Sequence, residues 1–379
     1  MIKLLTAYTR KADNPVKAVR EIQEQLNIKE NQLEHSAALI FCHIEFIESG
    51  VAEAVCQSLP FEVLGCSSMY FAVQEAADEI MLTVTVLTSD DTEFATGVSE
   101  SLTESNAEDC ISSLYQKTAA SFGAEPALIF AFPPTMLSLT SDVMTAALDR
   151  ACGGIPIFGA VALDMDMQIR RPKTIYQGAA YDDRMALLLF KGPVKPRFYS
   201  VLFPENSLFV QDAVITSAES NRIFSINNEP AVSFLKEIGL LQSDEQGFAV
   251  AIPLVIGDTD PQVVIMHGIG SEGELLCSRA VEAGGVLNIG AITANNVLES
   301  AHELIQEITE NGTGAGFIMF SCFLRNVVLG GNSRAEVELI QKELSSFPNP
   351  YLFLYSAGEL CPHENANQLF QYALIACQF

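Results

Sequence analysis

One pattern recurs three times along this chain: an apolar run, a helix-like segment and a second apolar run. The three examples are SAALIFCH–ESGVAEAVCQSL–FEVLGCSS, PALIFAFPP–TSDVMTAALDRA–IPIFGAVA and GFIMFSC–NSRAEVELIQKEL–PYLFLYSAGE. Nearly continuous apolar strands are typical of sheets that are covered on both faces. The pattern therefore predicts three strand–helix–strand units, with Gly65, Gly159 and Gly358 just past the second strands.

Two of the helix-like segments begin with residues that often cap helices. Ser141 is followed by Asp142, and Ser333 precedes Glu336 by three residues, which is the capping-box spacing. We therefore expect helices to begin at these serines.

Alternating segments between these units predict antiparallel strands. They are Ile80–Thr88, Arg184–Gly192 and Arg197–Pro204. The fold class we expect is α/β (α+β mixed), with mixed parallel and antiparallel sheets flanked by helices. Gly192, Pro193 and Pro196 interrupt two strand-like runs, so we expect two related domains of repeated units, 1–194 and 195–379.

Composition limits the partners of this 379-residue chain. There are 47 acidic against 21 basic residues, a formal net charge of −26, which disfavours nucleic acid and anionic membranes as partners. Nine scattered cysteines without a CxxC pair are typical of a reducing compartment. Lys11 and Asp13 interrupt the N-terminus, and no apolar stretch approaches the roughly 20 residues of a spanning helix. These features predict a soluble cytoplasmic protein.

A glycine-rich segment follows His267, where Gly268, Gly270 and Gly273 match G-x-G-x-x-G. A dinucleotide site would also need a helix directly afterwards and an acid about 20 residues further on. Residues 284–294 contain no acid, and the segment after the glycines resembles hairpin and loop. A glycine-rich hairpin turn is the better interpretation, and His267 is more simply a structural residue.

Asp164 and Asp166 could bind a hard cation through oxygen, but no calcium-loop pattern surrounds them. The simpler interpretation of Asp164 and Asp166 is that they are surface-loop acids. The basic cluster Arg170–Lys173 is likewise interpreted as a solvated turn and not as a phosphate site. We expect no metal site and no cofactor.

Cys322 could serve as a nucleophile if a base and an electropositive setting lowered its pKa. Arg325 is near in sequence, and His302 or His363 could approach in space. One alternative function is therefore a cysteine-dependent hydrolase or transferase that uses Cys322 or Cys361 with His363 as base. Cysteine is also among the residues most often buried without function, so no catalytic residue is assigned.

Arg325 needs an explanation, since an arginine in an apolar segment is normally paired or placed at a pocket mouth. Glu359 follows the glycine of the last unit and has the opposite charge. The two side chains could form a structural ion pair. They could instead hold a small ligand, with the arginine fork on its carboxylate and Glu359 on its ammonium group.

The chain resembles the FIST proteins, a sensory family with N-terminal and C-terminal FIST domains. In the first half the resemblance rests on ALIFCH, VLGCSSMYF and IPIFGAVALDMDMQIRRPKTIYQGAAYDDRMALLLFKG. In the second half it rests on EPAVSFLKEIG, GELLCSRAVEAGGVLNIG, MFSCFLR and LYSAGELCP. Leu324 stands where the family usually has glycine, and Ala357 where it usually has an aromatic residue.

The resemblance implies a sensory module that binds a small molecule such as an amino acid or a similar zwitterion. The family carries a Ser-Cys-x-x-Arg element, a Gly-Glu pair and an asparagine near its C-terminus. The positions of this chain that match them are the ligand-binding candidates Ser321, Cys322, Arg325, Gly358, Glu359 and Asn367. No kinase, cyclase or chemoreceptor segment is recognised, so we expect output through a separate signalling protein. Replacing Arg325 with Ala should abolish ligand binding in a folded protein, or unfold the protein if the ion pair is structural.

Overall fold

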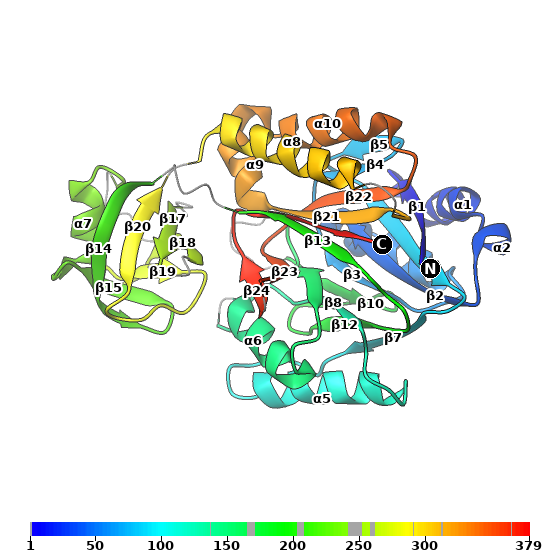
Figure 1. Cartoon of the computed structure of the whole chain (residues 1–379), viewed down its shortest axis with the longest axis horizontal. Coiled ribbons are helices and arrows are strands. Elements are labelled where there is room, and N and C mark those ends of the chain that lie inside the picture. Colours follow the sequence, from blue (N-terminus) through cyan, green and yellow to red (C-terminus); the bar gives the residue numbers. More distant parts are fainter. Residues whose placement is uncertain are drawn as a thin grey trace.

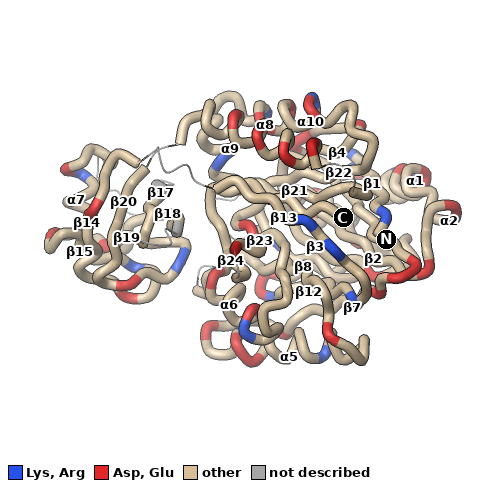
Figure 2. Tube along the Cα trace, in the orientation of Figure 1, with Lys and Arg blue, Asp and Glu red and all other residues tan. Residues whose placement is uncertain are grey.

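A computed structural model describes the chain over residues 2–136, 138–164, 171–202, 208–241, 252–257, 262–290, 292–311, 314–364 and 366–379. The protein is mixed α/β, with helices flanking sheets of parallel and antiparallel strands, as predicted. Figure 1 shows a larger body built on three sheets and a smaller body that is mostly β-structure. Asp and Glu are spread over both bodies and outnumber Lys and Arg (Figure 2).

The first sheet has the strand order β1-β6-β2-β3-β10-β11, in which β2 and β3 are parallel. Its strands are β1 (Lys3–Thr9), β2 (His35–Cys42), β3 (Val63–Ser67), β6 (Leu82–Ser89), β10 (Thr174–Tyr176) and β11 (Ala179–Tyr181). The helices of this part are α1 (Pro15–Leu26), α2 (Ile28–Asn31), α3 (Ile44–Glu48) and α4 (Val51–Gln57). Apolar residues of α1 and α4 form one core cluster with β2, β3 and β6, so these helices cover the outer face of the sheet.

The second sheet repeats this order as β7-β12-β8-β9-β23-β24, with β8 and β9 parallel. Its strands are β7 (Glu93–Val98), β8 (Leu128–Phe132), β9 (Ile157–Ala160), β12 (Ala186–Lys191), β23 (Glu359–His363) and β24 (Ala366–Phe370). Helices α5 (Ala107–Ala120) and α6 (Ser141–Cys152) pack on its outer face. Thr140 rather than Ser141 occupies the N-cap position of α6, so the prediction for that cap was one residue late.

The third sheet has the order β13-β25-β21-β22-β4-β5, with β21 and β22 parallel. Its strands are β4 (Phe71–Val73), β5 (Ala76–Asp78), β13 (Arg197–Val201), β21 (Phe317–Cys322), β22 (Tyr351–Ser356) and β25 (Leu374–Gln378). Its helices are α8 (Ala294–Glu310), α9 (Phe323–Leu329) and α10 (Ala335–Glu343), with short 3₁₀ turns at Gly330–Asn332 and Leu344–Ser346. All three predicted strand–helix–strand units are therefore present, each with a parallel strand pair.

Each unit gives its last hairpin to the sheet of another unit. The hairpin β4–β5 follows β3 in sequence but lies in the third sheet, β10–β11 follows β9 but lies in the first, and β23–β24 follows β22 but lies in the second. The exchange is cyclic, so the three units are interlocked. The predicted division at 194/195 lies between β12 and β13, where the second unit ends, and the two-domain boundary there stays a prediction.

The three sheets enclose one central core of buried apolar residues. The ring of Phe41 lies 5.4 Å from that of Phe132 and 5.7 Å from that of Phe320, so one residue from each unit meets at this point. Burying a phenylalanine side chain contributes about 1.5–3 kcal/mol to folding. The shared core is thus a strong reason for the three units to stay together.

Gly65 and Gly159 lie inside the second parallel strand of their units, not just past it as predicted. A Cβ atom at Gly65 would lie 1.9 Å from the carbonyl oxygen of Ile40, and one at Gly159 would lie 1.9 Å from that of Ala131. Only glycine allows the neighbouring strand to approach so closely. Gly358 does follow its strand, as predicted.

The smaller body is an antiparallel barrel inserted between β13 and α8. Its strands are β14 (Leu208–Glu219), β15 (Arg222–Ile226), β16 (Glu229–Pro230), β17 (Ile252–Ile256), β18 (Gln262–Ile269), β19 (Leu275–Cys277) and β20 (Val286–Gly290). Because β14 pairs with both β20 and β15, the sheet closes on itself around its own apolar core, with α7 (Ala231–Glu237) packed against it. Strands β18 and β19 form a hairpin, which confirms the hairpin interpretation of the glycine-rich segment.

In the described part of the chain, no helix combines the length and apolar character that a membrane crossing requires.

Candidate functional site

The carboxyl end of β21 sends two adjacent candidate side chains to opposite faces of the third sheet. Side chains alternate along a strand, so Ser321 faces the helices α8–α10, and Cys322 faces the side on which Phe320 joins the central core. Both side chains are fully buried. The predicted site is therefore divided by the sheet into an outer and an inner part.

The outer polar cluster consists of Ser300, Ser321, Arg325, Glu336 and Tyr355. Oε1 of Glu336 accepts hydrogen bonds from Nε and Nη2 of Arg325, at 3.0 and 2.7 Å. Its Oε2 accepts from the hydroxyls of Ser321 at 3.1 Å and Tyr355 at 2.7 Å. Nη2 of Arg325 also donates to Ser300 Oγ at 3.0 Å. Glu336 has the hydrogen-bond partners that a buried carboxylate needs.

The charge partner of Arg325 is thus Glu336 on α10, and not Glu359. The capping-box prediction was wrong, because α10 begins at Ala335 after the N-cap Arg334 and the Glu336 carboxylate points into the cluster. Burial, and then the charge of Glu336, hold the pKa of the Tyr355 hydroxyl well above its usual range. Tyr355 therefore acts as a neutral hydrogen-bond donor to Glu336.

The inner polar cluster consists of Cys322, Ser356 and Glu359. Ser356 donates to Oε1 of Glu359 at 2.7 Å. Oε2 of Glu359 is buried without a well-formed hydrogen bond from a described residue, although the Cys322 thiol and the Ala373 backbone lie close enough to the carboxyl group to lower its pKa. Burial holds the pKa of Glu359 well above its ordinary value, although the Ser356 hydrogen bond and the charge of Arg325 partly oppose this. The cluster therefore favours a protonated, neutral Glu359.

The Cys322 thiol next to this carboxyl group is also held in its neutral form. Burial raises its pKa well above the ordinary value, and Glu359, when ionised, raises it further. Cys361 is fully buried in the central core, where burial raises its pKa strongly. Within the described chain, no histidine side chain hydrogen-bonds to either thiol. Nδ1 of His302 lies 2.6 Å from Oε1 of Glu343, and the ring of His363 packs against that of Phe370. This arrangement gives no support to the cysteine-dependent enzyme.

The remaining candidates, Gly358 and Asn367, lie on or beside the exchanged hairpin β23–β24. A Cβ at Gly358 would meet apolar atoms of Leu369 and Val161 at 3.1 and 3.3 Å. Oδ1 of Asn367 accepts from the backbone amide of Ile157 at 2.7 Å, and its Nδ2 donates to Asp149 at 2.6 Å. Asn367 therefore connects the hairpin to β9 and α6. It lies on β24 three residues before Phe370, and Phe370 pairs with Glu359 on β23.

The possible cation ligands do not form a metal centre in the part of the chain that the structure describes. Asp164 is buried with Oδ2 3.5 Å from Nε of Arg171, whereas Asp166 and Arg170 lie outside the described residues. Among the described residues there is no group of three or more His, Cys, Asp and Glu side chains that could hold an ion.

Comparison with known families decides the identity of the two halves. The family model of the FIST N domain matches residues 36–229, and that of the FIST C domain matches residues 231–362. This chain belongs to the FIST family. FIST domains are generally taken to be small-ligand sensory domains in signalling.

Comparison of this FIST protein with curated proteins gave no match. Among solved structures, a cyanuric acid hydrolase from A. caulinodans aligns with a TM-score of 0.28 and 10% identity, over 51% of this chain and 72% of that one. PurLQS from Thermotoga maritima aligns with a TM-score of 0.19 and 10% identity, over 100% of this chain and 71% of that one. Such low scores carry no functional argument.

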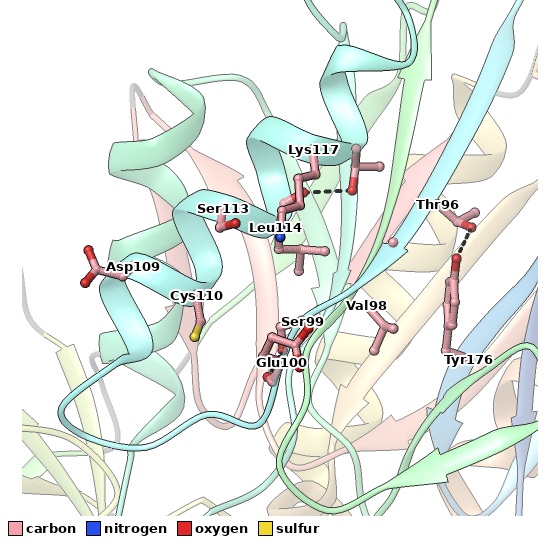
Figure 3. Close-up of a pocket in the computed structure, with 12 residues that line it drawn as sticks. Thr96, Val98, Ser99, Glu100, Asp109, Cys110, Ser113, Leu114, Lys117 and Tyr176 are labelled. Atoms are coloured by element: carbon pink, nitrogen blue, oxygen red, sulfur yellow. Dashed lines mark hydrogen bonds between the residues drawn. The ribbon is translucent and has the colours of Figure 1, made fainter.

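The FIST fold also forms open pockets that the sequence did not indicate. One of about 430 Å³ lies between α5 and the edge strand β7, and its lining includes Lys117, Glu100 and Tyr176. Figure 3 shows that Tyr176 and Thr96 hydrogen-bond to each other at one end of this pocket, whereas Asp109, on α5, lies toward the opposite end. Its charged side chains are exposed, as expected of a solvated helix face.

Sequence analysis missed Glu336, Tyr355 and Ser356 as members of the two clusters. A usable signal existed for Glu336, because it stands one helical turn before the buried Ile340 and so shares its inward face. For Tyr355 and Ser356, which lie in a uniformly apolar strand, no pattern distinguished a polar role.

Proposed function

We propose that this FIST protein is a sensor that binds an amino acid or a similar small zwitterion at the inner polar cluster and signals through a separate partner protein. The observation that supports this site most directly is Oε2 of Glu359, a buried carboxyl oxygen without a well-formed hydrogen bond among the described residues. Such an unsatisfied group costs about 1–3 kcal/mol, and a ligand donor could recover that energy.

The ammonium group of the ligand is the natural partner for Glu359. A cation beside the carboxyl group would favour its ionised form and lower its pKa, so that binding would release a proton. Affinity should therefore increase as the pH rises toward the raised pKa of the free protein.

The candidate partner for the ligand's carboxylate is Arg325, which belongs to the outer polar cluster but lies in α9, directly after the carboxyl end of β21. The ligand would have to pass around this strand end to reach both Arg325 and Glu359. Nε and Nη2 of Arg325 are engaged by Glu336, whereas Nη1 has no hydrogen-bond partner among the described residues. In this proposal Ser321 and Asn367 hold the frame of the site, and Gly358 keeps the turn before β23 compact. Because Arg325 and Glu359 are both buried, binding requires a local opening of the protein.

A thermal-shift screen against amino acids and related zwitterions tests the proposal, with an extrinsic dye because the chain has no tryptophan. A ligand at about 100 times its Kd adds about 2.7 kcal/mol of stability, which is readily seen. Glu359→Gln retains the size of the side chain but removes its charge, and Glu303→Gln on the exposed face of α8 is the matched control. We expect a selective shift that Glu359→Gln abolishes and Glu303→Gln retains. No shift across the panel, or an equal shift in Glu359→Gln, would contradict the proposal.

Arg325→Ala alone is a poor test. It leaves Glu336 buried without its charge partner, so lost binding could not be separated from lost folding.

A further inference from the structure

The exchanged hairpin β23–β24, which carries Glu359, has a short attachment to its host sheet. In the described chain, β23 pairs with β9 over two residues, Glu359 opposite Ala160 and Leu360 opposite Gly159. The other exchanged hairpins pair over three residues each, β10 with β3 and β4 with β22. Strand β24 lies at the edge of the sheet and, among the described strands, pairs with β23 alone. Backbone pairing therefore fixes this hairpin less firmly than the other two.

The barrel adds a contact to the free edge of the hairpin. Nη1 of Arg279 donates to the carbonyl oxygen of Leu369 on β24 at 3.2 Å, and Nε of Arg279 lies 4.0 Å from Oδ2 of Asp142 in the first turn of α6. The backbone amide of Ala280 donates to the same oxygen of Asp142 at 3.4 Å. Arg279 thus connects the barrel to both α6 and the hairpin.

These contacts lie where the two bodies are not closely packed. Ala280 lines a cavity of about 450 Å³ whose other walls come from the start of α6 and from the turn between β14 and β15. The side chains of Arg279 and Asp142 are 17% and 15% exposed, so their charges are screened less than those of a surface pair. Polar contacts, and not close apolar packing, therefore join the barrel to the larger body at this point.

Glu359 favours opening of the hairpin, whereas Arg279 opposes it. Oε2 of Glu359 is buried without a well-formed hydrogen bond in the described chain, and an open hairpin would let water bind to this oxygen. Opening would break the hydrogen bond from Arg279 to Leu369, the residue before the strand partner of Glu359. The position of the barrel and the exposure of Glu359 are therefore linked through one side chain.

We propose that Arg279 is a latch, which holds the hairpin β23–β24 closed over the inner polar cluster while the barrel rests against α6. Movement of the barrel away from α6 releases the hairpin and exposes Glu359 and, on the same strand, Cys361. The coupling is reciprocal, so anything that favours the open hairpin also weakens the hold on the barrel. Its use in signalling rests on the function proposed above, since a ligand that binds only the open site would release the barrel.

Amide hydrogen exchange of the full chain without ligand tests the latch. Arg279→Ala should raise the exchange rates of the protected amides of β23 and β24 about tenfold or more, because a hydrogen bond from a charged donor is lost. Alkylation of Cys361 should become faster by a similar factor, whereas exchange in β2 and β3 should not change. No increase in the hairpin, or an equal increase in β2 and β3, overturns the proposal.

Arg222→Ala is the matched control. It removes an arginine from the same barrel, but the acidic neighbour of Arg222 is Glu274, 3.8 Å away and also in the barrel. Exchange in β23 and β24 should therefore stay at the wild-type rate. An increase equal to that of Arg279→Ala would show that the effect is a general loosening of the barrel, which contradicts the latch.

Asp142→Asn tests the latch from the larger body. It retains the size of the side chain and an oxygen that can accept from Ala280, but it removes the charge that faces Arg279. We expect faster exchange in the hairpin than in the wild type. The double variant should match Arg279→Ala within about twofold, because both substitutions act on the same contact. No increase, or fully additive effects, contradicts the proposal. The ligand screen with Glu359→Gln is a separate measurement, so the latch and the ligand site can fail independently.

Discussion

Nη2 of Arg325 lies 2.7 Å from Oε1 of Glu336, and the side chains are only 3% and 0% exposed. An ion pair so deeply buried is weak evidence for net stability, because both ions lose their hydration. Removing one partner is a different matter, since the other charge remains buried without compensation. The outer polar cluster should therefore be sensitive to the loss of either charged partner.

Arg325→Ala should lower the free energy of unfolding by about 3–5 kcal/mol, measured by urea denaturation. Arg150→Ala is the matched control, because Arg150 pairs with Glu108 on the exposed surface and its loss should have a much smaller effect. Equal effects of the two substitutions would show that the loss of Arg325 does not leave the Glu336 charge buried without compensation.

Glu359 should make the protein less stable as the pH rises. Its pKa is raised by folding, so the folded state binds the proton more tightly than the unfolded state does. This contribution is fully present below the ordinary pKa of 4.5 and is lost progressively as the pH rises through the raised pKa. Urea midpoints from pH 5 upward should therefore fall less in Glu359→Gln than in the wild type. Parallel pH profiles would contradict this sign.

Iodoacetamide should label the folded protein at Cys110 only. Cys110 is half-buried, whereas the other eight cysteines are buried, and burial raises the pKa of Cys152, for example, to about 11. The thiolate is the reactive form, so these buried thiols should react slowly. Peptide mass spectrometry with and without denaturant measures the sites. Rapid labelling of Cys322 or Cys361 in the folded protein would restore the enzyme alternative.

Gly65→Ala and Gly159→Ala should each destabilise the protein by about 2 kcal/mol or more, because the new methyl group requires the backbone of the adjacent strand to move. The added Cβ would lie 1.9 Å from a carbonyl oxygen at both positions. Gly331→Ala, where no atom lies within 4 Å of the added Cβ, is the control for the methyl group itself. Thermal denaturation compares the three, and a similar midpoint for all would refute the close-approach argument.

Much of the architecture was accessible from local pattern. Apolar runs with intervening helical spacing predicted the three parallel pairs, and the glycine-rich segment after His267 predicted a hairpin. The exchange of hairpins was not accessible. The alternation of apolar and polar residues in a hairpin such as β23–β24 predicts which of its faces is buried. It does not predict with which of three similar sheets the hairpin pairs.

The candidate site shows the same limit more sharply. The sequence by itself indicated that Arg325 is paired or lies at a pocket mouth, because an unpaired guanidinium is too costly in an apolar setting. Only the tertiary structure decided between the acids. Glu336 comes from α10 on the outer face of the third sheet, whereas Glu359 lies beside Cys322 on the inner face. Burial cost is a property of one residue and can be read locally, but partner choice depends on how separate elements meet in space.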